Sequence, residues 1–119
     1  MSPSISSMNP RVIVIQKLYS QYINKSEKID FQKHRYKKFI KDIVLGTLER
    51  KELIEDTIHE HLNKDINIAR TEKLLIVVFH AAVYELLDRP QTPSNVIINE
   101  YLDSSLYVLE KSQEKYLDA

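Results

Sequence analysis

The chain has 119 residues, which is enough for one domain with a single core but too few for two. Hydrophobic residues make up 43% and charged residues 29%, a balance typical of globular domains rather than of disordered chains. One glycine, four prolines and no cysteine favour long helices over a turn-rich β architecture and exclude a disulfide framework. No apolar run reaches membrane-spanning length and no signal-peptide core is present near the start, so we expect a cytoplasmic protein.

The formal net charge is zero, but the two halves of the chain differ strongly. Residues 1–51 contain eleven Lys and Arg against four Asp and Glu, whereas residues 52–119 contain six against thirteen. Two interpretations are open. The basic half is suited to phosphates and the acidic half to a basic partner, or the two halves pair with each other in the fold.

The predicted elements begin after a serine-rich tail, residues 1–9, which we expect to be disordered. A first helix covers residues 10–23, and residues 24–30 form a polar linker. Asp30 is a candidate cap for a second helix. Apolar residues recur along these two helices at helical spacing, and we expect them to face the core: Val12, Ile15, Tyr19 and Tyr22 in the first, and Phe31, Tyr36, Phe39, Ile40 and Ile43 in the second.

A third helix is predicted over residues 51–62, followed by a loop over 63–70. The fourth, residues 71–88, is apolar on nearly every side, so we expect it to be the buried centre, packed all round. Pro90 ends it, and Thr92 then fits the N-cap and Pro93 the first position of a fifth helix reaching about residue 109. A sixth helix begins near Ser112. Residues 10–119 are therefore predicted to form a single all-α bundle of about six helices.

Four segments follow one another in a characteristic order. They are Arg11-V-I-V-I-Gln16-K-Leu18-Tyr19, Asp42-I-V-L-Gly46 with Leu53, Ile54 and Ile58 after it, the stretch from Y-E-L at residue 84 to V-I-I-N-E at residue 100, and Lys115-Tyr116-Leu117-Asp118. In order and approximate spacing they resemble the NusB family of bacterial transcription antitermination factors over most of the chain. Where that family continues its last helix the sequence stops at Ala119, so we expect a shortened last helix.

The resemblance implies a function that composition alone does not. NusB proteins bind the boxA RNA element in single-stranded form and pair with NusE, which is also a ribosomal protein of the small subunit. The complex helps RNA polymerase to resist termination. The resemblance places RNA contacts at Arg11, Lys115 and Tyr116, and approximate alignment places NusE contacts at Glu72 and Glu110.

One departure from the family opens an alternative. The Arg-rich run that precedes the first helix in the family is replaced here by Ser7, Met8, Asn9 and Pro10, so that only Arg11 remains. The alternative is a protein-only scaffold that binds NusE with weakened or lost RNA binding. A third hypothesis is the NusB-like accessory domain of ribosomal RNA cytosine methyltransferases. That enzyme needs a Rossmann-type domain with a glycine-rich loop, which this sequence lacks.

Each candidate residue also has a structural interpretation. The basic segment 33–41, with interleaved aromatics, offers Lys37, Lys38 and Lys41 as further RNA contacts, but it also fits the solvated face of an amphipathic helix. Arg11 either binds phosphate or caps a neighbouring helix, and Tyr116 either stacks on a base or fills a groove between helices. Exposed glutamates such as those at 72 and 110 often serve solvation alone.

Neither a metal site nor catalysis is predicted. His59 and His61 lie two apart on a helix and face different ways, and Glu55 with His59 supplies two ligands without a third. His80 is expected to be a core histidine with a hydrogen-bond partner. The sequence contains no phosphate-binding glycine loop, G-x-S-x-G or H-E-x-x-H motif, and we expect no cofactor. A shortened last helix would expose apolar surface on the fourth and fifth helices, and a homodimer would cover it.

Overall fold

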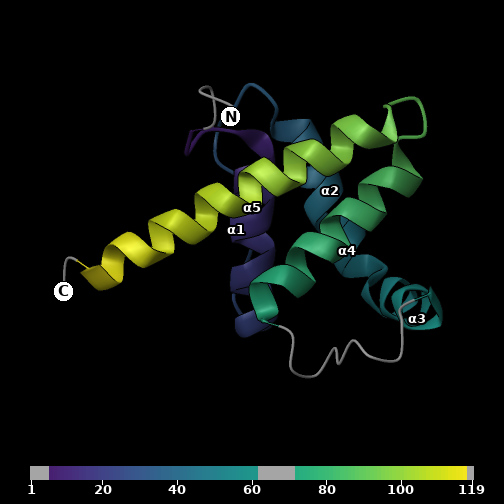
Figure 1. Ribbon diagram of the computed structural model, residues 1–119, viewed down its shortest axis with the longest axis horizontal. Coiled ribbons are helices and arrows are strands. Elements are labelled where there is room, and N and C mark those ends of the chain that lie inside the picture. The colour runs from purple at the N-terminus through teal and green to yellow at the C-terminus, as the bar shows by residue number, and fades with distance from the viewer. Residues whose placement is uncertain (1–5, 62–71, 118–119) are drawn as a thin grey trace.

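The computed structural model describes residues 6–61 and 72–117, and this part of the chain is helical without strands. It contains five helices: α1 (Pro10–Ile23), α2 (Lys37–Glu49), α3 (Lys51–His61), α4 (Lys73–Asp88) and α5 (Ser94–Leu117). In Figure 1, α4 and α5 form a V in front of α1 and α2, and α3 lies to one side. The predicted all-α class is confirmed, with five helices in place of about six.

Helix α1 is the centre of the bundle. It begins at Pro10 as predicted, because the side chain of Asn9 accepts hydrogen bonds from the first N–H groups and Pro10 needs no donor there. It packs against α2, α4 and α5. Several of its side chains have no exposed surface, and these form the middle of the core: Val12, Val14, Ile15 and Leu18.

The second helix begins six residues later than predicted, at Lys37 rather than directly after Asp30. The intervening residues are held in non-helical form by side-chain bonds, which compete with a helix. Lys17 of α1 donates to the carbonyl of Asp30, and His34 Nδ1 accepts from the N–H of Tyr36 at 2.9 Å. Asp30 is therefore not a helix cap, and Phe31 packs on the core from an irregular segment.

The prediction that the fourth helix is packed all round is wrong for the described residues. One side of α4 is buried, including Val77 and Ala81, but Leu75, Phe79 and Leu87 are 45%, 51% and 67% exposed. A second apolar stripe follows on α5, where Ile98, Leu102 and Leu106 are about half exposed. Together these side chains form an apolar α4–α5 face with no covering element among the described residues.

Helix α5 is continuous where two helices were predicted. It starts at Ser94, with the carbonyl of Pro93 accepting the first helical hydrogen bond, so the cap lies one residue after Thr92. It runs without a break through Ser112 to Leu117. Figure 1 shows its far half extending beyond the rest of the bundle. Among the described residues, no helix is both long and apolar enough to span a membrane.

His80 is a core histidine, as predicted. It is 2% exposed, and its Nδ1 lies 2.5 Å from the hydroxyl of Tyr22 on α1. Burial, and secondarily the charge of Lys51, lower the pKa of His80 to about 4, so the ring is neutral and its Nδ1 shares a hydrogen bond with the Tyr22 hydroxyl.

Residues 6–9, part of the tail expected to be disordered, form a turn in which the N–H of Asn9 donates to the carbonyl of Ser6. The predicted loop at 63–70 lies outside the described residues.

Candidate nucleic-acid interface

A cleft of about 460 Å³ lies between α1 and the irregular segment before α2. Its α1 wall consists of five residues along one side of the helix: Ile13, Gln16, Lys17, Ser20 and Gln21. The opposite wall is the segment 27–34, and Lys37 and Ile40 of α2 close one end. We call this the basic cleft, because four of its lining residues are lysines: Lys17, Lys28, Lys33 and Lys37.

His34 joins two chain segments that line the basic cleft. His34 Nδ1 accepts from a backbone N–H, so its Nε2 must carry the proton that is donated to the carbonyl of Met8 at 2.7 Å. Both Met8 and His34 line the basic cleft. The neutral ring thus fixes the residues before α1 against the segment that leads into α2.

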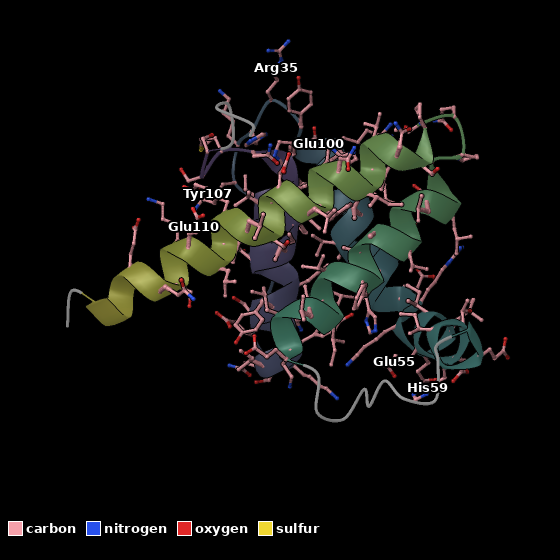
Figure 2. All side chains as sticks on the ribbon, in the orientation of Figure 1. Arg35, Glu55, His59, Glu100, Tyr107 and Glu110 are labelled. Atoms are coloured by element: carbon pink, nitrogen blue, oxygen red, sulfur yellow. The ribbon has the colours of Figure 1, made fainter. Side chains whose placement is uncertain are left out.

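The first turn of α2 extends the positive surface beyond the basic cleft. It holds Lys37 and Lys38, has no acidic residue, and receives no side-chain hydrogen bond at its N-cap, Tyr36. Lys41 follows one turn later and is exposed like both of these lysines. Figure 2 shows Arg35 pointing away from the body of the molecule just before this helix. Basic residues next to the positive end of a helix repel it, so this arrangement concentrates positive potential.

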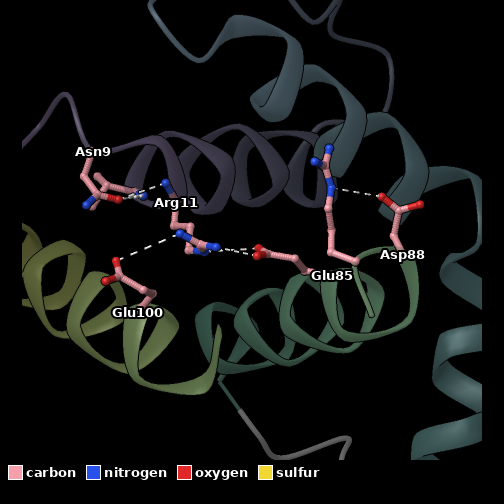
Figure 3. Close-up of polar contacts among 7 residues, drawn as sticks. Asn9, Arg11, Glu85, Asp88 and Glu100 are labelled. Atoms are coloured by element: carbon pink, nitrogen blue, oxygen red, sulfur yellow. Dashed lines mark hydrogen bonds and ion pairs between the residues drawn. The ribbon is translucent and has the colours of Figure 1, made fainter. Parts of the chain in front are cut away.

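Arg11, in contrast, is engaged inside the fold. Its Nε donates to Glu85 Oε1 at 3.1 Å, its Nη2 pairs with the other carboxylate oxygen, and its Nη1 lies 4.0 Å from Glu100 (Figure 3). The side chain of Arg11 is 15% exposed and that of Glu85 1%. Burial by itself would lower the pKa of Arg11, but the hydrogen bond and the charge of Glu85 outweigh it and raise that pKa. The Glu85 carboxylate thus occupies the fork that a phosphate would need.

Aromatic rings enclose this ion pair. The guanidinium carbon of Arg11 lies 5.1 Å from the centroid of Phe39 and 5.6 Å from that of Tyr101. Arg89 lies 5.3 Å from the Phe39 centroid and pairs with Asp42 at 3.5 Å. The two arginines therefore fix α2 to α1 and α4 through one ring, which is a structural role.

The ion pairs show whether the basic half of the sequence is neutralised by the acidic half. Of the eleven basic residues in the first half, Arg11 alone pairs with a carboxylate among the described residues. In the pair between Arg89 and Asp42, the basic residue comes from the second half of the chain and the acidic residue from the first. In the described part of the chain, most of the basic half is therefore not neutralised by the acidic half.

The other predicted residues lie on separate elements. Glu72 directly precedes α4 and Glu110 lies on the far half of α5; both are exposed, and these two regions lie apart in Figures 1 and 2. Lys115 and Tyr116 lie in the last turn of α5, but their side chains are outside the described part. No group of three or more potential metal ligands occurs among the described residues.

Sequence reasoning missed two features. The basic cleft was not predicted because part of its wall, residues 31–34, is irregular, whereas the sequence pattern predicts a helix there. The partner of Arg11 was also missed, although a signal existed: Glu85 is the only acidic residue between Lys73 and Leu87, and a carboxylate in such an apolar run needs a cation.

Comparison with known proteins identifies the family. Residues 7–113 match the NusB family. Transcription antitermination protein NusB of Lysinibacillus sphaericus is 38% identical over 80 residues, which cover 67% of this chain and 62% of that protein. The corresponding protein of Rhodopseudomonas palustris (strain TIE-1) is 31% identical over 81 residues, covering 68% and 47%. That of Bartonella tribocorum is 26% identical over 77 residues, covering 65% and 49%.

The match spans between about half and 62% of the length of these relatives. No solved structure gives a significant match. The family match nevertheless covers most of this chain, from the turn before α1 to the last turns of α5, and agrees with its all-helical fold. The chain belongs to the NusB family.

Proposed function

We propose that this protein is an RNA-binding adaptor in transcription antitermination. In this proposal it pairs with the NusE ribosomal protein on single-stranded, boxA-type RNA and acts on RNA polymerase in the cytoplasm through that complex. Its role is to position other molecules, not to catalyse a reaction. Membership of the NusB family and the names of its relatives support the antitermination role.

The observation that carries RNA binding is the set of basic side chains without carboxylate partners around the basic cleft and the first turn of α2. Lys17, Lys28, Lys33 and Lys37 line the cleft, and none forms an ion pair with a described residue. Unpaired lysines bind backbone phosphates as point charges and release counterions, which gives affinity without sequence preference. They offer a substitute for the missing Arg-rich run.

We therefore assign the main phosphate contacts to these lysines rather than to Arg11. Arg11 stays a predicted contact from the family resemblance, but the Glu85 carboxylate competes with phosphate for its guanidinium. Lys115 and Tyr116 stay in the proposal as a basic–aromatic pair at the end of α5.

A charge-reversal variant tests RNA binding. Changing Lys37, Lys38 and Lys41 together to Glu should weaken binding of labelled boxA-type RNA by at least tenfold at moderate salt. It should also lower the slope of log affinity against log salt by about 0.7 for each phosphate that the variant no longer neutralises. The matched control reverses three exposed lysines elsewhere, Lys25, Lys73 and Lys111, and so has the same net charge. Equal binding by both variants would contradict the proposed site.

The same titration separates the adaptor from the scaffold alternative. RNA is titrated with the protein alone and with NusE across a salt series. Affinity that rises when NusE is added supports the adaptor. Binding to NusE with no gain in RNA affinity supports the protein-only scaffold.

For the protein partner, we propose contacts at Glu72 and Glu110. Both are exposed: Glu72 directly precedes α4, and Glu110 lies on the half of α5 that extends beyond the bundle. Reversing both to Lys should weaken NusE binding, measured by calorimetry, by about 1 kcal/mol, since exposed ion pairs contribute little each. Reversing Glu114 and Glu52, which are also exposed, serves as the control and should leave NusE affinity unchanged.

We also propose that a second copy of the chain covers the apolar α4–α5 face in the absence of partners. Two such faces brought together by a twofold axis would bury Phe79 and Leu102 of each copy. Sedimentation equilibrium tests this: Phe79→Glu should convert a dimer to a monomer, and a monomeric starting protein would rule the dimer out.

A further inference from the structure

The basic cleft has the dimensions of a small-molecule site and not only those of a charged surface. Its volume of about 460 Å³ lies within the range of pockets that enclose a ligand of nucleotide size. The lysines alone would need no cavity, because they bind backbone phosphates as point charges on an open surface. The cavity therefore points to a ligand group that enters it.

The interior of the cleft is divided between apolar and polar groups. Ile13, Ile29 and Phe31 supply apolar surface, and Lys17 lies over the Phe31 ring with its ammonium 5.5 Å from the centroid. Gln16 and Gln32 also line the cleft, and neither side-chain amide hydrogen-bonds another described residue. An amide both donates and accepts, so the two glutamines match the mixed polar edge of a nucleobase.

The charge of the cleft favours a phosphate at its entrance. Four lysines of the lining face two carboxylates, Glu27 and Asp30. The net charge of the lining is thus positive. An acidic peptide would satisfy the lysines, but it would leave the apolar surface and the two amides without matching groups.

We propose that the basic cleft binds one unpaired nucleotide of the RNA strand, with its base inside the cleft and its phosphate at the lysines. This inference rests on the proposed RNA-binding function and adds the subsite in which a single base is read. The base lies against Ile13, Ile29 and Phe31, and its edge faces Gln16 and Gln32. Single-stranded RNA is recognised in this way, because unpaired bases can turn outward from the strand.

The test fills the cleft without changing its charge. Ser20 is exposed on α1 and lines the cleft, so Ser20→Trp places an indole where the base would lie. The control is Ser94→Trp, at an exposed serine that begins α5 and does not line the cleft. Ser20→Trp should weaken RNA binding roughly tenfold, the loss expected from one unstacked base, while the salt slope stays that of the wild type. Circular dichroism checks that both variants fold.

A second measurement uses the unmodified protein. The four nucleoside 5′-monophosphates are titrated separately into ¹⁵N-labelled wild-type protein, and the side-chain amide signals of Gln16 and Gln32 are followed. Shifts of these signals, with one base shifting them at lower concentration than the others, support the proposal. Shifts confined to lysine-bearing segments outside the cleft, or no shift at all, would overturn it even if Ser20→Trp fails to fold.

The outcomes separate this inference from the function on which it rests. If Ser20→Trp binds RNA like the wild type while the Lys37, Lys38 and Lys41 reversal weakens it, the nucleotide subsite is wrong and the RNA-binding surface stands. If the lysine reversal and Ser20→Trp both leave RNA binding unchanged, the proposed function fails together with the subsite.

Discussion

Replacing Glu85 by Gln isolates the contribution of the buried ion pair to stability. The substitution keeps the size of the side chain and removes its charge, so the Arg11 guanidinium is left between Phe39 and Tyr101 without its counter-charge. Glu100 is too distant to replace it, since the separation is 4.0 Å and that carboxylate is 39% exposed.

The geometry gives the expected magnitude. Removing one partner of a buried ion pair costs about 3–5 kcal/mol of unfolding free energy, because the remaining charge is buried alone. Glu85 is 1% exposed, but Arg11 is 15% exposed and can recover some hydration, so we expect the lower end, about 3 kcal/mol. For a chain of this size that corresponds to a fall in melting temperature of about 10 °C.

Urea unfolding followed by circular dichroism measures the loss. Arg11→Met should cost a similar amount, because it leaves the carboxylate of Glu85 buried and unpaired. The double variant Arg11→Met/Glu85→Gln should cost much less than the two losses added together, since no buried charge then remains. Glu114→Gln, which breaks an exposed pair with Lys111, is the control and should change stability by less than about 0.5 kcal/mol. A loss below about 1 kcal/mol for Glu85→Gln, or strict additivity in the double variant, would refute the reasoning.

Two further predictions concern other helix contacts. The pKa of His80, lowered by burial and by Lys51 from 6.5 to about 4, means that the unfolded chain binds a proton that the folded chain lacks between these values. The unfolding free energy should therefore fall as the pH drops from about 6.5 to 4, by up to about 3 kcal/mol, and less steeply in His80→Gln. A Cβ at Gly46 would lie 2.2 Å from the Tyr84 ring, so Gly46→Ala should destabilise the fold by about 1–3 kcal/mol.

Each of these has an outcome that would contradict it. Equal pH slopes for wild type and His80→Gln, from urea midpoints at several pH values, would mean that other groups control acid sensitivity. For Gly46→Ala, increased thermal stability, as expected for alanine in an open helix interior, would mean that the Tyr84 ring moves aside freely.

Local signals in the sequence predicted the ends of the helices where the relevant atoms lie within a few residues. Asn9 and Pro10 form a complete start signal for α1, and Pro90 marks the end of α4 because it cannot continue the backbone hydrogen bonds. The start of α2 was not predictable in this way. It depends on Lys17 and Met8, which bond the segment before the helix from outside it.

The candidate site likewise contains some features that local sequence signals predicted and others that they did not. The exposure of Lys37 and Lys41 followed from helical periodicity, because polar residues on one side of an amphipathic helix face water. The role of Arg11 did not, since its partner Glu85 lies 74 residues away. A sequence pattern shows that a buried charge needs a partner, but it does not show which residue becomes that partner.

The ion pair between Arg11 and Glu85 also constrains when the chain can complete its folding during synthesis on the ribosome. The arginine belongs to the first helix, and its partner belongs to the fourth, so the arginine emerges long before the glutamate. Because α1 packs against α2, α4 and α5, it has no complete set of neighbours until nearly all of the chain has been synthesised. The nascent chain therefore carries an unfinished core, with the apolar side of α1 open to chaperones, and folding is completed only when α4 and α5 arrive.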